Sequence, residues 1–308
     1  MRLLDLKIDS IECKNQKKHP SSYHAILPQH EFSMLIVAPK GSGKTNLLCN
    51  LILKHYKGYF HRVIVCSPTV NNDDKWDIVK KSKNVLAENT RKDIQSKLKT
   101  KCQKVVFHGK DSPEKKFEGI IPEEDFISSL DDLPIKLKEQ NDDIKRLSKT
   151  HEHAKFSADR ILIIMDDQSG NFKGGVNNNP MINFVARHRH YCASVIIVAQ
   201  AYKTIPKTIR TNMNCLILFE IPNVKELGCI YEENPEGMRY ADWQCLYTHA
   251  TKEPFSFLYT NNKFPKGERV YKRFETMLTI CNDIDASSLK RTASDNATPN
   301  KKAKLWRS

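Results

Sequence analysis

The sequence lacks the features that would place the protein in a membrane or outside the cell. No run of about 18 apolar residues occurs, and the N-terminal stretch MRLLDLKIDSIECKNQKK has no long apolar core followed by a small-residue cleavage site. None of the nine cysteines belongs to a CxxC pair, and several lie inside apolar runs. We therefore expect neither secretion nor a membrane span, and neither a disulfide scaffold nor a zinc site.

Acidic residues are outnumbered in this chain. The 308 residues include 50 Lys and Arg against 36 Asp and Glu, a formal net charge of +14. This excess predicts an anionic partner, of which nucleic acid is the commonest, although basic tails on a soluble protein would produce the same balance. The length permits one large α/β domain with appendages or two small domains, and we favour one domain with tails.

Short apolar runs bounded by polar segments predict buried β-strands. They lie at residues 32–37, 62–66, 160–165, 194–199 and 215–219. Residues 46–56 instead have the apolar spacing of one helix face. Strands that alternate with helical stretches predict an α/β fold, with a mostly parallel sheet covered by helices on both faces. We place this domain at residues 25–270, after a lead-in over 1–24.

Two further segments differ from this pattern. Apolar residues recur every three or four positions between Phe126 and Leu147, which predicts a kinked helical insertion at about 110–158 that packs on its own domain or contacts another subunit. The C-terminal segment, 271–308, becomes polar and basic from about 286, and we expect that tail to be disordered. Its clusters at 290–291 and 301–304 resemble a bipartite nuclear localisation signal, with non-specific DNA affinity as the rival use.

The stretch APKGSGKTN connects the first predicted strand to the first predicted helix. A phosphate-binding loop needs small residues whose backbone N–H groups surround the phosphates, a lysine, and a hydroxyl for Mg²⁺ where the helix begins. The candidate nucleotide-binding residues are Ala38, Pro39, Lys40, Gly41, Ser42, Gly43, Lys44, Thr45 and Asn46. Ala38 stands where the strict pattern has glycine, and alanine fits there if its φ is negative.

Polar side chains also follow two other predicted strands. Asp166 and Asp167 come directly after one strand, and Gln200 closes another. In nucleotide hydrolases an acid at such a strand end holds Mg²⁺ and its neighbour polarises the attacking water. The carboxyl edge of a parallel sheet is where ligands bind, so Gln200 can contact a γ-phosphate or the water there.

These motifs together carry a resemblance over roughly residues 25–260. APKGSGKT, VIVCSPT, IIMDDQ, RHRHYCASVIIVAQ and IPKTIRTNMNCLILF resemble the FtsK–HerA superfamily of DNA-pumping ATPases, especially the poxvirus-type genome-packaging ATPases of large eukaryotic DNA viruses. The resemblance implies an additional-strand P-loop (ASCE) fold that binds ATP and Mg²⁺. It implies that Lys44 contacts the β- and γ-phosphates and that Thr45 and Asp166 hold Mg²⁺. Asp167, which stands where many members have Glu, would activate water, and Gln200 would be the sensor.

The resemblance also implies an assembly and partners. Ring ATPases of this kind, hexamers or pentamers, complete each site with an arginine from the neighbouring subunit. The candidates are Arg187, Arg189 and Arg210, and we favour the first two. The expected partners are double-stranded DNA bound without regard to sequence, further copies of the chain, a capsid vertex or capsid protein, and nuclear import receptors. We expect the protein in the host nucleus, at the viral assembly site or in the virion.

Several alternatives stay open. A DNA helicase or another pump of the same superfamily would share every motif, and an ATP-binding assembly factor with little hydrolysis is compatible with Ala38 and Asp167. A P-loop kinase is disfavoured, because it needs neither Gln200 nor so basic a body. The loop at 170–176 follows the paired acids and contains Phe172 and Lys173, so it is a candidate DNA contact or an active-site flap.

Overall fold

The computed structural model describes residues 25–87, 118–133, 137, 160–172, 179–234 and 236–280. The predicted lead-in, most of the predicted helical insertion and the basic tail with its clusters at 290–291 and 301–304 lie outside these residues. Their proposed structure and roles stay predictions. In the described part of the insertion, Phe126 and Ile127 form a strand that pairs with Val65 and Cys66, so the prediction of a helix from Phe126 is wrong there.

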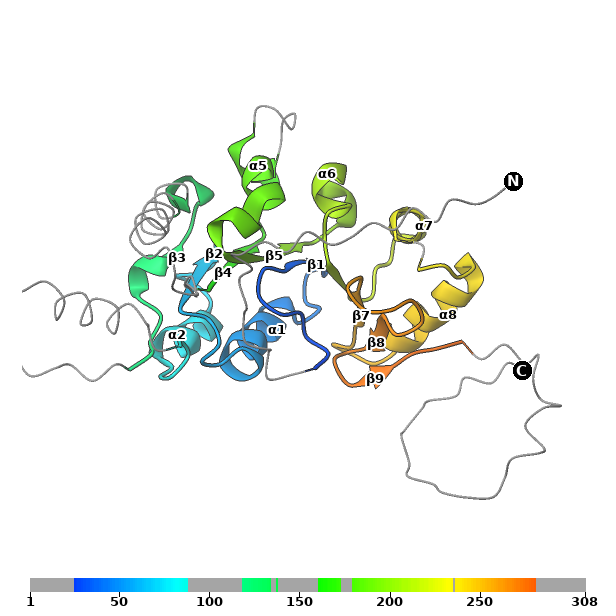
Figure 1. The fold of residues 1–308 in the computed structure, drawn as a ribbon, viewed down its shortest axis with the longest axis horizontal. Helices are drawn as coiled ribbons and strands as arrows, with labels where there is room; N and C mark the ends of the chain where they lie inside the picture. Colours follow the sequence, from blue (N-terminus) through cyan, green and yellow to red (C-terminus); the bar gives the residue numbers. More distant parts are fainter. Residues whose placement is uncertain are drawn as a thin grey trace, which may run out of the picture.

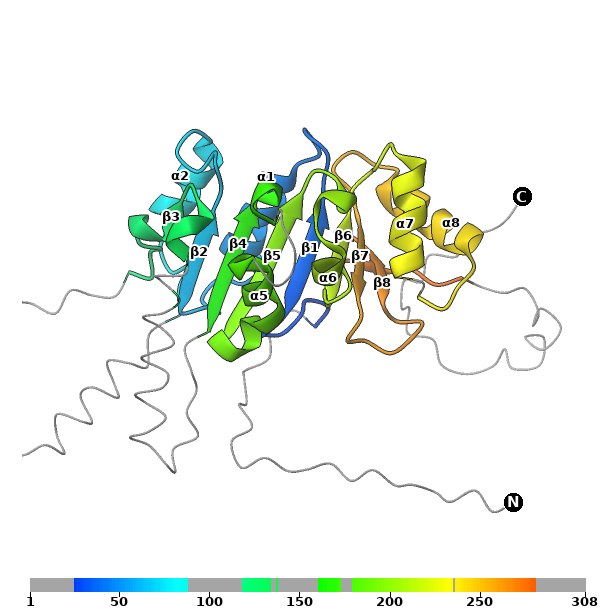
Figure 2. The same cartoon turned by 90° about the horizontal axis from the view of Figure 1, so that it is seen from above.

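The described residues form one nine-stranded sheet, in the order β3-β2-β4-β5-β1-β6-β7-β8-β9 (Figures 1 and 2). The strands are β1 Ser33–Val37, β2 Arg62–Cys66, β3 Phe126–Ile127, β4 Ile161–Asp166, β5 Ala193–Ala199, β6 Cys215–Leu218, β7 Leu258–Asn261, β8 Val270–Lys272 and β9 Thr276–Met277. Strands β1 to β6 pair in parallel, and β7, β8 and β9 add to β6 in antiparallel fashion. The sheet therefore continues past residue 270.

The five predicted strands are confirmed and correspond to β1, β2, β4, β5 and β6. They are continuous apolar runs because both of their faces are buried, which is the usual situation in a parallel sheet. Strand β5 lies between β1 and β4 and pairs with both. It is the additional strand that the resemblance implies, so the predicted fold class is confirmed.

Helices cover both faces of the sheet (Figure 1). Along β1, Leu35 and Val37 point into one hydrophobic core, whereas Met34 and Ile36 point into the other. The first core is completed by α5 Pro180–Arg187, α6 Lys207–Arg210, α7 Val224–Glu233 and α8 Tyr240–Thr251. The second is completed by α1 Lys44–Asn50, the π-helix η1 Leu51–His55 and α2 Asp74–Lys81.

The helix predicted at 46–56 is present but changes type. It is α-helical as α1 and continues as η1, where the Tyr56 N–H donates to the Leu51 carbonyl at 2.8 Å, an i→i+5 bond. The short 3-10 helices are η2 Glu123–Asp125, η3 Leu130–Asp132, η4 Ser169–Phe172, η5 His188–Tyr191 and η6 Tyr202–Thr204. No helix in the described ranges is both long and apolar enough to cross a membrane.

Candidate active site

Three neighbouring strands end at the same edge of the sheet. The pairing places Val37 beside Ala199 and Asp166 beside Val198, so the residues that follow β1, β4 and β5 lie next to one another. Backbone hydrogen bonds continue this pairing past the strands, because the Ala38 N–H donates to the Ala199 carbonyl at 2.9 Å. The phosphate-binding loop, the paired acids and Gln200 therefore share one edge of the sheet.

The loop after β1 has the backbone that its glycines predict. Gly41 and Gly43 have φ values of +82° and +92°, in the left-handed region that favours glycine. Ser42 closes the turn, because its N–H and its hydroxyl both donate to the Pro39 carbonyl, at 3.2 and 2.7 Å. Gly43 caps α1 without a side-chain hydrogen bond, so the first N–H groups of that helix are available to an anion.

Ala38 is compatible with this loop. It is not among the described residues with positive φ, so the added methyl group brings no backbone strain. Its side chain is fully buried in the core below α1. Alanine can therefore stand at position 38 in place of the glycine of the strict pattern.

Lys44 and Asp166 meet at the centre of this edge. The Lys44 Nζ lies 3.9 Å from the Asp166 Oδ1, and the Ser67 hydroxyl donates to the Asp166 Oδ2 at 3.1 Å. Burial raises the pKa of the Asp166 carboxyl above its ordinary value, while Lys44 and the Ser67 hydroxyl offset part of that rise. The site thus keeps a buried carboxylate that its neighbours only partly compensate.

The residues present fit a divalent cation. The Asp166 Oδ1 is buried and has no hydrogen-bond partner, and its interaction at this edge is the ion pair with Lys44 at 3.9 Å. Thr45, in the first turn of α1, lines the cavity beside Lys44. A carboxylate and a hydroxyl are oxygen ligands of the kind that Mg²⁺ prefers.

Asp167 and Gln200 are brought together as well. The Gln200 Nε2 lies 3.0 Å from both carboxylate oxygens of Asp167. Asp167 has a φ of 54°, in the left-handed region that is uncommon for residues other than glycine. Strained backbone of this kind persists where the surrounding structure holds it and is frequent at functional sites.

Arg187 and Arg189 lie at the opposite edge of the sheet. They precede β5, whereas the candidate site follows it, and the seven residues of β5 span roughly 20 Å at about 3.3 Å per residue. Between them, His188 is buried and its Nδ1 lies 2.6 Å from the Ala193 carbonyl, which anchors the turn; both arginines are exposed. Neither guanidinium can thus reach the site of its own chain.

Arg210 is engaged within its own chain. Its guanidinium pairs with both carboxylate oxygens of Glu233, at 2.9 and 2.7 Å, and donates to the Ile205 carbonyl at 2.7 Å. The side chains of Arg210 and Glu233 are only 9% and 10% exposed, and the Tyr202 hydroxyl donates to the same carboxylate at 2.7 Å. This buried pairing favours Arg187 and Arg189 over Arg210 for a role in a neighbouring subunit.

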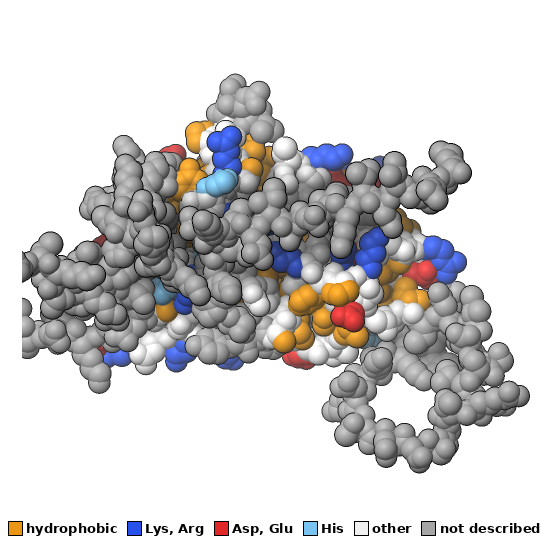
Figure 3. Space-filling model, viewed as in Figure 1, with side chains coloured by type: hydrophobic (Ala, Val, Ile, Leu, Met, Phe, Trp, Pro, Cys, Tyr) orange, Lys and Arg blue, Asp and Glu red, His pale blue; other side chains and the backbone are white. Residues whose placement is uncertain are grey.

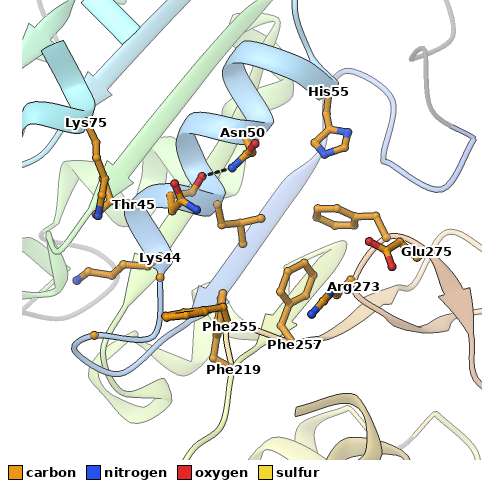
Figure 4. A pocket seen from close by; sticks show the side chains of 15 residues that line it. Lys44, Thr45, Asn50, His55, Lys75, Phe219, Phe255, Phe257, Arg273 and Glu275 are labelled. Carbon is orange, nitrogen blue, oxygen red and sulfur yellow. Dashed lines mark hydrogen bonds between the residues drawn. The ribbon is translucent and has the colours of Figure 1, made fainter. Parts of the chain in front are cut away.

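Sequence reasoning missed several residues around the site. Ser67 ends the run RVIVCS, and only its pairing with Asp166 reveals its position. Lys75, on α2, lines the cavity together with Lys44 and Thr45, and Figure 4 shows its side chain beside the first turn of α1. The fully buried Trp76 packs α2 against this core, which fixes the position of Lys75.

The loop after the paired acids differs from its prediction. Phe172 is 2% exposed and packs in the hydrophobic core, so its proposed contact with DNA is wrong, because burying the ring leaves it inaccessible. Lys173 and the rest of that loop to 178 lie outside the described residues. On the face shown in Figure 3, the Lys and Arg side chains of the described part are spread along the molecule.

The raised pKa of the Asp166 carboxyl leads to a prediction about stability. Because its pKa is raised on folding, its ionisation costs stability as the pH rises from about 3.9, the value for unfolded aspartate, through the native value. We expect Asp166→Asn to raise the Tm of the nucleotide-free protein at pH 7, and the gain to vanish when the pH falls below this window. Thermal unfolding across pH measures both effects.

Asp125 provides the matched control. Its side chain has the same 3% exposure as that of Asp166, but it pairs with Arg62 through two hydrogen bonds of 2.9 and 2.7 Å. Asp125→Asn should therefore lower stability at pH 7, by about 1–3 kcal/mol. If Asp166→Asn lowers the Tm as Asp125→Asn does, the charge at Asp166 is compensated and the interpretation is wrong.

Part of the chain matches the model of a known protein family. Residues 120–230 match the family model described as Poxvirus A32 protein, and this part includes Asp166, Asp167 and Gln200. No curated protein matches the chain.

Solved structures resemble the chain at 14% identity. The DNA-packaging ATPase B204 of Sulfolobus Turreted Icosahedral Virus covers 79% of this chain and 97% of its own, with a TM-score of 0.44. The genome packaging NTPase B204 of Sulfolobus turreted icosahedral virus 2, in complex with ATP-gammaS, covers 79% and 98%, with a TM-score of 0.46. The pCW3 conjugation coupling protein TcpA covers 75% and 58%, with a TM-score of 0.38. Likeness at these scores carries no conclusion about activity, whereas the match over residues 120–230 confirms, for that part of the chain, the predicted resemblance to the poxvirus-type packaging ATPases.

Proposed function

We propose that the protein is an Mg²⁺-dependent ATPase that moves double-stranded DNA into a viral capsid. One observation carries the ATPase part: side chains from three separate strand ends meet at one edge of the sheet. Lys44 lies 3.9 Å from Asp166, and Gln200 lies 3.0 Å from Asp167. A lysine, two acids and an amide around the N-terminus of a helix are the groups that phosphoryl transfer to water requires.

The phosphates of the nucleotide would bind at the start of α1. Backbone N–H groups from Gly41 to Thr45 would donate to the phosphates there, and the Lys44 ammonium would add a positive charge next to them. Thr45 and Asp166 would hold Mg²⁺, which, when bound, neutralises charge that develops on the phosphate oxygens. The buried Asp166 Oδ1, which accepts no hydrogen bond, supports this assignment.

Asp167 would activate the attacking water. Its carboxylate accepts a proton as the water oxygen bonds to the γ-phosphorus and the bond to the β–γ bridging oxygen breaks, which yields ADP and phosphate. Gln200 donates to Asp167 in this structure, and this bond holds the carboxylate at the edge of the sheet. When a γ-phosphate is present, the same amide can donate to it instead, so Gln200 would report the nucleotide state through β5.

The match to the Poxvirus A32 protein and the charge of the chain support DNA as the substrate that is moved. A motor that advances over any sequence must contact the phosphate backbone, not the bases. Dispersed Lys and Arg side chains suit that task. The capsid partner, the nuclear import receptors and the location of the protein stay predictions from the sequence.

Steady-state ATP hydrolysis tests this function. Long double-stranded DNA should raise the rate of the wild-type protein, whatever the DNA sequence. Lys44→Ala and Asp167→Asn should each lower the rate by at least about 10²-fold, because they remove a phosphate contact and the proton acceptor. The control Val224→Ala, an exposed residue that does not line the cavity beside the phosphate-binding loop, should hydrolyse as the wild type does.

Two results would contradict the proposal. If the wild type binds ATP but hydrolyses it no faster than Lys44→Ala, even at concentrations that favour oligomers, the protein is an ATP-binding assembly factor. If DNA stimulates hydrolysis and the protein separates DNA strands without a capsid, it is a helicase of the same superfamily.

A ring in which Arg187 or Arg189 completes the neighbouring site makes a separate prediction. Arg189→Ala and Lys44→Ala should each be inactive, and a mixture of the two should regain activity. The mixed ring contains sites with an intact Lys44 beside a subunit with an intact Arg189, and such an arginine contributes about 10³–10⁵ in rate. The same experiment with Arg187→Ala separates the two arginines.

The matched control combines two lesions of one site. A mixture of Lys44→Ala and Asp167→Asn has no site in which both residues are intact, so it should stay inactive. If neither arginine variant is rescued by mixing, the site is not completed by Arg187 or Arg189 of a neighbouring subunit.

A further inference from the structure

A cavity of ≈ 690 Å³ lies beside the phosphate-binding loop (Figure 4). One side of it is formed by Gly43, Lys44 and Thr45, the residues assigned to the phosphates. The other side consists of four aromatic residues, which we name the aromatic pocket: Phe219, Phe255, Phe257 and Phe274. Ligand sites of about 300–1,000 Å³ combine an apolar lining with a few polar groups, as this cavity does.

Phe255 is the unusual member of the aromatic pocket. Its side chain is 68% exposed, the most exposed large hydrophobic residue of the described part, and its φ of 61° is in the left-handed region. A Cβ atom placed on Gly43 would lie 3.0 Å from the Phe255 Cδ1, so the ring lies directly against the phosphate-binding loop. Strained backbone of this kind is frequent at ligand clamps and active sites.

The other three phenylalanines are buried and fix the wall behind it. Phe257 packs on Phe219 and Phe274 with ring centroids 5.3 and 5.1 Å apart. Phe219 follows β6 and Phe257 precedes β7, so the sheet holds this wall in place next to β1. Phe255 is therefore the only aromatic residue of the pocket with a ring face available to a ligand.

Polar groups surround the aromatic pocket on two sides. Asn50 is the last residue of α1 and His55 is the last residue of η1, and both line the cavity. Arg273 and Glu275 come from the turn between β8 and β9. These side chains supply donors and acceptors beside the four phenylalanines, as Figure 4 shows.

We propose that the aromatic pocket binds the base of the nucleotide, with Phe255 stacked on a purine ring. The proposal rests on the proposed nucleotide site, because the base can enter this pocket only if the phosphates bind at Lys44. A flat, heteroaromatic base matches an exposed phenyl ring with polar groups at its rim, and the two fused rings of a purine cover more of that ring than a pyrimidine does. Phe255 is thus the specificity residue of the site.

Binding measurements with three probes test the proposal: ATP, CTP and inorganic triphosphate. We expect the wild type to bind ATP more tightly than CTP. Phe255→Ala should weaken ATP binding by about 5- to 150-fold, the range for loss of one base–aromatic stack, and should leave the binding of inorganic triphosphate unchanged. Phe255→Tyr should bind ATP as the wild type does, and Val224→Ala, which removes an equally exposed side chain elsewhere, should have no effect.

The outcomes separate this proposal from the function on which it rests. If the wild type binds neither ATP nor inorganic triphosphate, both fail. If the wild type binds both probes, Lys44→Ala binds neither, and Phe255→Ala binds ATP as the wild type does, only the stacking proposal fails. Equal weakening of ATP and inorganic triphosphate by Phe255→Ala also overturns it, because the residue then acts on the loop. Equal affinity of the wild type for ATP and CTP overturns the preference for a purine.

Discussion

A parallel sheet brings the carboxyl ends of its strands to one edge, and the candidate site depends on that constraint. Because β5 lies between β1 and β4, the segment after it reaches both the phosphate-binding loop and the paired acids. The bond from Gln200 to Asp167 crosses from β5 to β4, and the contact from Lys44 to Asp166 crosses from α1 to β4. A shift of one strand by a single residue would turn these side chains away from one another.

The electrostatics of the site follow from where that edge lies. Asp166 is buried at the end of a strand that is apolar along its length, and its Oδ1 has no hydrogen-bond partner. Such a carboxylate costs stability in the absence of a cation, and the same cost becomes binding energy for a cation. Asp125 shows the alternative, because its side chain is as little exposed as that of Asp166 but pairs with Arg62 through two hydrogen bonds. The difference between Asp166 and Asp125 is what supports the proposal that Asp166 binds a cation.

Local patterns in the sequence predicted five of the nine strands, the loop, the paired acids and Gln200, because each of these follows from a run of neighbouring residues, whereas β3, β7, β8 and β9 were missed. Contacts between distant segments were out of reach. Phe255 lies more than two hundred positions after Gly43, and only the folded chain brings its ring against the loop. Phe172 and Arg210 show the same limit. Phe172 is buried in a core that distant segments build, and Arg210 pairs with Glu233, which lies on another helix. The π-helix that follows α1 was hidden because its apolar spacing resembles that of an α-helix.

The most direct test of the account is a structure of the protein with Mg²⁺ and an ATP analogue that cannot be hydrolysed. We predict that the terminal phosphates lie at the start of α1 in contact with Lys44 and that the cation contacts the Asp166 Oδ1. We also predict that the Gln200 amide has turned from Asp167 to the γ-phosphate or to the attacking water. Phosphates bound away from this edge of the sheet, or a cation that does not contact Asp166, would contradict the account.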